Sequence, residues 1–159
     1  MRVIGIDPGY DRLGVAVLEG RPGQETLLHS CCISSDTQSP LSERLYTIGS
    51  AFSEIVDTYQ PTVVGIETLF FNKNVKTAID VAQARGVISY LAVRSGAAVC
   101  ELSPQSIKVA VTGHGGSDKT AVTTMVRRLL PNVPTNALDD EYDAIAVALT
   151  CLAHSSGRQ

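Results

Sequence analysis

The distribution of apolar residues along the chain is the feature that most constrains its fold. Three short runs rich in apolar and β-branched residues come first, at residues 2–7, 13–19 and 25–34, with turn residues between them. Such runs predict strands joined by short connections. Apolar residues then recur every three or four positions over residues 40–59, which predicts a helix that ends before Pro61.

Strands and helices alternate in the rest of the chain. The remaining predicted elements are strands at residues 62–67 and 97–102, and helices at 75–94, from Pro104, at 118–130 with Ser117 as N-cap, and from Asp139. This order predicts an α/β domain with a five-stranded mixed sheet flanked by helices, antiparallel at the start and with crossovers later. A hydrophobic content of 44% in 159 residues is enough for one sizeable core. We therefore expect a single domain at residues 1–155 and a short polar tail at 156–159.

Four acidic residues that are scattered along the sequence all stand at ends of these predicted elements: Asp7, Glu67, Asp140 and Asp143. The first two end strands, and sites in α/β sheets form outside the carboxyl ends of strands, so they converge if their strands are neighbours. The other two are three residues apart in the first turn of a helix and share one face. A few carboxylates together with substrate phosphates are the usual ligands of Mg²⁺. The set predicts a divalent-metal site for phosphate chemistry, although taken singly such acids are often solvated or act as helix caps.

Other classes of protein fit the sequence poorly. No apolar run is long enough for a membrane span and no secretion signal opens the chain, so we expect a cytoplasmic protein with no membrane attachment. The cysteines have no CxxC spacing and the histidines are isolated from them, which argues against a zinc site or a disulfide framework. The glycine-rich stretch at residues 113–120 has Asp118 where a nucleotide-binding P-loop needs glycine.

The distribution of charge says more than its total. A net charge of -3 does not by itself suggest nucleic acid, because binding to the DNA backbone normally relies on Lys and Arg. From Lys73 to Arg128, however, there are eight basic residues and only three acidic ones. These basic residues either lie on solvated helix faces or form a surface for a polyanion.

Several short motifs occur in order along the chain: GIDPG at residues 5–9, IE at 66–67 followed by FFNKN at 70–74, QARG at 83–86, VTG at 111–113 and DEYDA at 140–144. Together, and over nearly the whole chain, they closely resemble the RuvC family of bacterial Holliday-junction resolvases. The resemblance implies an RNase H-like nuclease fold and a homodimer. It also implies Mg²⁺-dependent paired nicking of four-way DNA junctions, which leaves 5′-phosphate and 3′-hydroxyl ends.

The resemblance also implies roles for single residues. By motif position the four acids match the catalytic quartet of the family, which is expected to hold two Mg²⁺ ions per active site, with Mn²⁺ as a substitute. Asp139 is a rival to Asp140, although the Asp-x-x-Asp-Ala register favours the latter. Lys108 and Lys119 fall where the family carries basic residues near the scissile phosphate.

Further residues match DNA-contacting positions or the subunit interface. Phe70 matches the aromatic position implicated in unstacking bases at the junction centre, and Phe71 doubles it. We also expect DNA contacts from Lys73, Lys76 and Arg85. The resemblance suggests that the helix at residues 75–94 pairs across the two-fold axis through its small residues, and that a RuvA–RuvB branch-migration complex is a partner.

Two other functions compete with junction resolution. A different RNase H-like nuclease, acting on RNA or other branched nucleic acid, would share the carboxylates. A non-catalytic junction-binding protein would not need them. The four acids argue against such a protein, because converging acids beside a phosphate are repulsive unless metal fills the space between them.

Overall fold

The structure, a computed structural model, describes residues 1–68 and 75–156, with only the backbone described at residues 75, 76 and 156. The strands are β1 (Arg2–Asp7), β2 (Arg12–Glu19), β3 (Thr26–Ser34), β4 (Val63–Glu67) and β5 (Ala98–Leu102). The helices within these residues are α1 (Leu41–Tyr59), α2 (Val75–Arg94), α3 (Pro104–Thr112), α4 (Lys119–Leu129) and α5 (Asp139–Ser156). The predicted order is confirmed, and the predicted ends differ from the observed ones by at most one residue.

The strands form one five-stranded sheet in the order β3-β2-β1-β4-β5. β1 and β2, and β2 and β3, pair antiparallel, whereas β4 lies parallel to both β1 and β5. The predicted mixed sheet is therefore confirmed. Ile6 of β1 pairs with Ile66 of β4, so Asp7 and Glu67, the next residue of each strand, lie at the same edge of the sheet.

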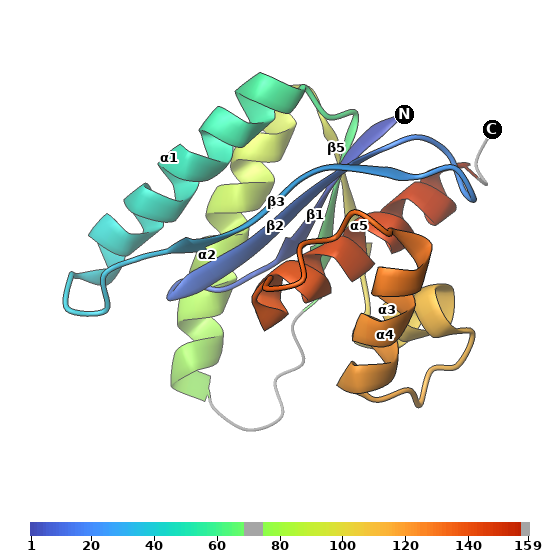
Figure 1. The fold of residues 1–159 in the computed structure, drawn as a ribbon. Helices are drawn as coiled ribbons and strands as arrows, with labels where there is room; N and C mark the ends of the chain where they lie inside the picture. Colours follow the sequence, from blue (N-terminus) through green and yellow to red (C-terminus); the bar gives the residue numbers. More distant parts are fainter. Residues whose placement is uncertain (69–74, 157–159) are drawn as a thin grey trace.

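Helices cover both faces of the sheet (Figure 1). α1 and α2 lie on one face, where Ile4 and Ile6 of β1 pack with Phe52 and Ile88. α5 lies on the other face with α3 and α4 outside it, and there Val3 packs among residues of α5. Because successive side chains of a strand point to opposite faces, a central strand with both faces covered has a nearly continuous apolar sequence.

Two glycines allow α5 to lie very close to the sheet. A Cβ added to Gly5 of β1 would lie 2.2 Å from the carbonyl oxygen of Ala144. A Cβ added to Gly14 of β2 would lie 2.1 Å from the carbonyl oxygen of Asp140. Any side chain at either position would therefore push the start of α5 away from β1 and β2.

The start of α4 differs from the prediction. Asp118, not Ser117, is the N-cap: it has extended backbone angles and its side chain accepts a hydrogen bond of 2.8 Å from the amide of Ala121. Ser117 Oγ instead lies 2.7 Å from Thr112 Oγ1. A carboxylate is as good an N-cap as a hydroxyl, and here the loop places the carboxylate one residue closer to the helix.

Only the first residue of the predicted polar tail at 156–159 falls within the described residues. Ser156 belongs to α5, and residues 157–159 lie outside the described residues. In the part of the chain that the structure describes, no helix has the length and apolar character needed to cross a membrane.

Candidate active site

Asp7 lies at the end of β1, where the other three predicted acids converge on it. The pKa of its carboxyl is raised to about 7, first by burial and then by the charges of Asp143, Glu67 and Asp140. Lys119 acts in the opposite direction. Like charges raise the pKa of a carboxyl only when they are near it, so the structure brings the four acids together at one edge of the sheet.

A cavity of about 200 Å³ brings two of these acids together with the two predicted lysines. Glu67 and Asp143 line it with Lys108 and Lys119, and apolar side chains of α3, α4 and α5 complete its wall. Burial and Asp143 raise the pKa of Glu67, whereas Lys119 and Lys108 lower it. Both lysines are thus close enough to act electrostatically on the acidic edge.

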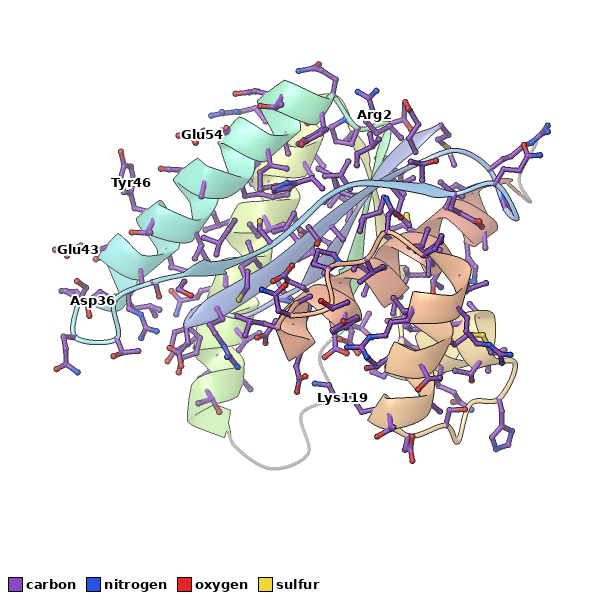
Figure 2. The ribbon with its side chains drawn as sticks, in the orientation of Figure 1. Arg2, Asp36, Glu43, Tyr46, Glu54 and Lys119 are labelled. Atoms are coloured by element: carbon purple, nitrogen blue, oxygen red, sulfur yellow. The ribbon has the colours of Figure 1, made fainter. Side chains whose placement is uncertain are left out.

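Lys119 is the first residue of α4, and it points from that helix toward the start of α5 (Figure 2). Its Nζ lies 3.0 Å from Asp143 Oδ2 and 3.4 Å from Asp139 Oδ2. Burial raises the pKa of Asp143 and outweighs the opposing effect of Lys119. The Asp143 carboxyl is therefore harder to ionise than a free one even with the lysine beside it.

Asp140 and Asp139 have different surroundings. The side chain of Asp140 is 20% exposed and its charge acts on Asp7, whereas the side chain of Asp139 is 78% exposed. The geometry therefore favours Asp140 as the fourth member of the acidic cluster. Asp139 lies at its rim.

Two neighbours of Asp140 were not predicted from the sequence. Arg12 Nε lies 3.2 Å from Asp140 Oδ2, and Cys32 Sγ donates a weak hydrogen bond to the same oxygen at 3.8 Å. One feature of the sequence could have indicated Arg12, because it is a basic residue that follows shortly after Asp7. No such feature indicates Cys32, because its contact depends on the register of β2 and β3 and on where α5 lies.

The acidic cluster fits a divalent metal by its chemistry. All four groups are carboxylates, the hard oxygen ligands that Mg²⁺ prefers. As the side chains stand, no three His, Cys, Asp or Glu groups among the described residues are arranged to hold a metal ion. Arg12 and Lys119 pair with Asp140 and Asp143, so these two carboxylates would have to exchange partners to share an ion with Asp7.

Of the predicted DNA-contacting residues, the structure describes only the side chain of Arg85. Phe70, Phe71 and Lys73 lie outside the described residues, and the side chain of Lys76 at the start of α2 is not described. The side chain of Arg85 is 19% exposed and its Nη2 lies 2.8 Å from Glu101 Oε1 of β5. Contact of Arg85 with DNA stays a prediction.

A five-stranded mixed sheet with helices on both faces, and with acids gathered at the ends of its two central parallel strands, defines an RNase H-like nuclease. The crossover junction endodeoxyribonuclease RuvC family matches residues 3–151. The chain belongs to this family.

Individual relatives agree with this assignment over almost their full length. The crossover junction endodeoxyribonuclease RuvC of Heliobacterium modesticaldum is 41% identical over 155 residues, which cover 98% of this chain and 95% of that protein. The protein of the same name from Caldanaerobacter subterraneus is 40% identical over 156 residues. Among solved structures, Thermus thermophilus RuvC in complex with a Holliday junction substrate has 31% identity and a TM-score of 0.92, and the match covers 98% of this chain and 94% of that one.

The raised pKa of Asp7 predicts that Asp7→Asn stabilises the folded protein at pH 8 without divalent metal. The pKa of Asp7 rises from 3.8 in the unfolded chain to about 7 in the folded protein, so the folded protein holds a proton that the unfolded chain has released. The protonated Asp7 therefore favours the folded state, and this stabilisation is lost as pH rises through about 7. Asparagine cannot ionise, so Asp7→Asn should raise the free energy of unfolding above that of the wild-type protein by on the order of 1 to 3 kcal/mol at pH 8. The increase should become smaller toward pH 5. Chemical denaturation at both pH values measures this difference.

Asp139→Asn is the matched control, because it removes the same charge from an exposed side chain. We expect it to change the free energy of unfolding by less than Asp7→Asn at pH 8. Equal gains from the two variants, or a gain from Asp7→Asn that does not depend on pH, would contradict the buried acidic cluster.

Proposed function

We propose that this protein resolves four-way DNA junctions by paired, symmetric nicking of two strands. The observation that carries the proposal is the convergence of four carboxylates and two lysines at one edge of a RuvC-type fold. The similarity to Thermus thermophilus RuvC, whose structure contains a Holliday junction substrate, supports a DNA junction over RNA. A cytoplasmic location and a RuvA–RuvB partner stay predictions.

We infer that Asp7, Glu67, Asp140 and Asp143 hold two Mg²⁺ ions, for which Mn²⁺ would substitute. When bound, the ions supply an activated water and stabilise the attacking and leaving oxygens of an in-line displacement. The reaction is hydrolysis: water attacks phosphorus, the bond from phosphorus to O3′ breaks, and O3′ leaves as a hydroxyl while the phosphate stays on the 5′ end. Asp7 must be deprotonated to serve as a ligand, so metal binding should weaken as pH falls below about 7.

The two lysines act on the charge of the phosphate. Both line the cavity that Glu67 and Asp143 share, so a phosphate held by the acids through metal would have ammonium groups beside it. Fixed positive charges aimed at developing negative charge stabilise the transition state.

Asp7→Asn should cleave junctions at least about a hundredfold more slowly while it still binds them, because a strong electrostatic interaction is lost. Single-turnover cleavage of mobile and immobile four-way junctions, with and without Mg²⁺, measures the effect and maps the nicks. Asp139→Asn is the control and should cleave much faster than Asp7→Asn. Near-normal cleavage by Asp7→Asn would rule out the acidic cluster as the metal site.

The same assay separates the competing functions. Preferential cleavage of an RNA substrate by the wild-type protein would indicate a different RNase H-like nuclease. Junction binding with no cleavage in Mg²⁺ or Mn²⁺ would indicate a binding protein.

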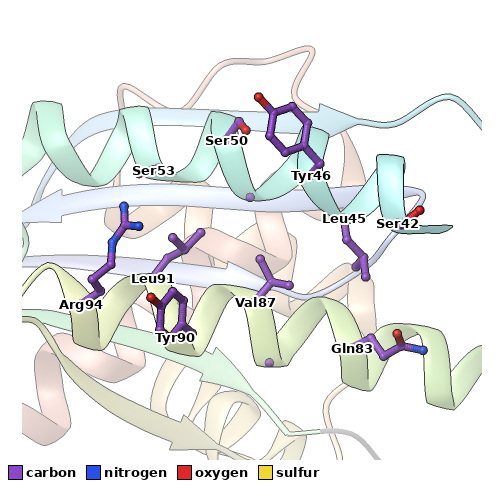
Figure 3. Close-up of a pocket in the computed structure, with 12 residues that line it drawn as sticks. Ser42, Leu45, Tyr46, Ser50, Ser53, Gln83, Val87, Tyr90, Leu91 and Arg94 are labelled. Carbon is purple, nitrogen blue, oxygen red and sulfur yellow. The ribbon is translucent and has the colours of Figure 1, made fainter. Parts of the chain in front are cut away.

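We also propose that the protein is a homodimer that pairs through the outer surface of α1 and α2. A groove of about 780 Å³ runs between these helices, and Figure 3 shows Tyr46 of α1 and Tyr90 and Leu91 of α2 along it. Tyr46 is 76% exposed and Tyr90 64% exposed, and Ile79 and Val93 of α2 are also exposed. Large apolar side chains gathered on one surface of a folded chain favour contact with another protein. A second copy would bring a second active site for the second cut.

Gly86 of α2 supports this interface. Glycine inside a helix costs roughly 0.5 to 1 kcal/mol relative to alanine. A Cβ at Gly86 would have no atom within 4 Å in this chain, so packing within the subunit gives no reason for glycine there. Close approach of a partner helix gives one. Ile88 of α2, by contrast, is buried in the core and cannot contribute to this surface.

Ala82→Glu tests the interface, because Ala82 is exposed on α2 and a charge there would have to be buried in the dimer. We expect sedimentation to show a folded monomer that nicks junctions poorly. Ala153→Glu makes the same substitution at an exposed position of α5, which lies on the other face of the sheet from α1 and α2, so it should remain a dimer. An unchanged dimer of Ala82→Glu would reject this surface.

The proposed role of Phe70 in unstacking bases is tested by Phe70→Ala. Stacking of a base on an aromatic ring is worth roughly 1 to 3 kcal/mol, so cleavage should fall by about five- to 150-fold. The melting temperature should stay nearly unchanged. Phe71→Ala is the paired variant and shows which ring acts. Normal cleavage by Phe70→Ala, or a markedly lower melting temperature, would assign Phe70 to packing.

A further inference from the structure

Arg12 is a cation next to the acidic cluster that no part of the proposed reaction uses. It opens β2 directly after the turn that follows Asp7, and its Nε lies 3.2 Å from Asp140 Oδ2. Cys32 of β3 contacts the same oxygen. Because Cys32 pairs with Gly14, and Gly14 lets the backbone of Asp140 approach β2, both contacts are built into the sheet and α5.

The turn just before Arg12 is fixed in place by its neighbours. Asp11 forms an ion pair with Arg44 of α1, whose side chain is only 9% exposed. The guanidinium of Arg44 lies over the ring of Tyr10, 4.5 Å from its centre, and its Nε donates to Ser35 Oγ at 3.0 Å. The backbone beside Arg12 is therefore held firmly against α1.

The side chain of Arg12, in contrast, has room to move. It is 54% exposed, and it lines an open pocket of about 310 Å³ that Asp140 also lines. Gly9, Tyr10 and Val81 form other parts of that pocket. The guanidinium can thus leave Asp140 for this space without any shift of the backbone.

A divalent ion on Asp140 would take a carboxylate that Arg12 already holds. Two cations on one carboxylate repel each other, and the repulsion is stronger here than at a free surface because Asp140 is only 20% exposed. We propose that Arg12 is a positioning residue that competes with divalent metal for Asp140 and so sets the metal concentration that the active site needs. This inference rests on the proposed role of Asp140 as a metal ligand.

Mn²⁺ binding to the purified full chain without DNA, measured by titration calorimetry, tests the competition. Arg12→Gln should bind Mn²⁺ roughly three- to thirtyfold more tightly than the wild-type protein, and the Mg²⁺ concentration for half-maximal junction cleavage should fall by a similar factor. In an Asp140→Asn background, Arg12→Gln should have little effect, because the shared carboxylate is gone. Arg12→Lys keeps the charge and should lie nearer to wild type.

Arg21→Gln is the matched control, because it removes the same charge from an exposed turn between β2 and β3. It should leave Mn²⁺ affinity unchanged. If Arg12→Gln binds Mn²⁺ like the wild type, or if its gain persists in Asp140→Asn, the inference is wrong while the proposed metal site stands. If the wild type binds no Mn²⁺, the proposed metal site fails and the inference fails with it.

Discussion

The close contact between α5 and the sheet is the constraint on which the site depends. The first turn of α5 carries Asp140 and Asp143, and Asp7 lies on β1 beneath it. Only residues without a side chain at positions 5 and 14 let the helix backbone come this near. Dense packing then fixes the distance, because a well-packed interior transmits any displacement to its neighbours. A larger residue at either glycine would move two of the four acids as one body.

Gathering four carboxylates at this edge works against folding. Burial and mutual repulsion raise the pKa values of Asp7, Glu67 and Asp143 together, which means that the ionised cluster destabilises the folded state. Lys119 from α4 and Arg12 from β2 offset part of this cost from opposite sides. Two kinds of positive charge therefore reduce the repulsion among the carboxylates: the cations of the protein itself and, in the proposed reaction, the metal ions.

Much of the fold and the acidic cluster could be predicted from the sequence because their signals are local. Continuous apolar runs identify the buried strands, and an acid directly after such a run lies at the edge of the sheet. What could not be predicted depends on distant parts of the chain meeting. Arg12 contacts Asp140, which is far from it in the sequence, and Arg85 pairs with Glu101 only because β5 lies beside α2. Ser117 and Asp118 are both good N-caps, and only the loop geometry chooses between them.

The order in which the elements are synthesised determines when the four acids can come together. β1 and β4 are parallel, so Asp7 and Glu67 meet only after the chain between them has crossed over the sheet. The remaining two acids arrive with α5, which follows all the other described elements in the sequence. Domains fold as units during synthesis, and a nascent chain that lacks α5 has only Asp7 and Glu67 of the acidic cluster and leaves one face of its sheet uncovered. A ribosome-bound fragment of this protein therefore lacks two of the four proposed metal ligands until translation has passed the start of α5.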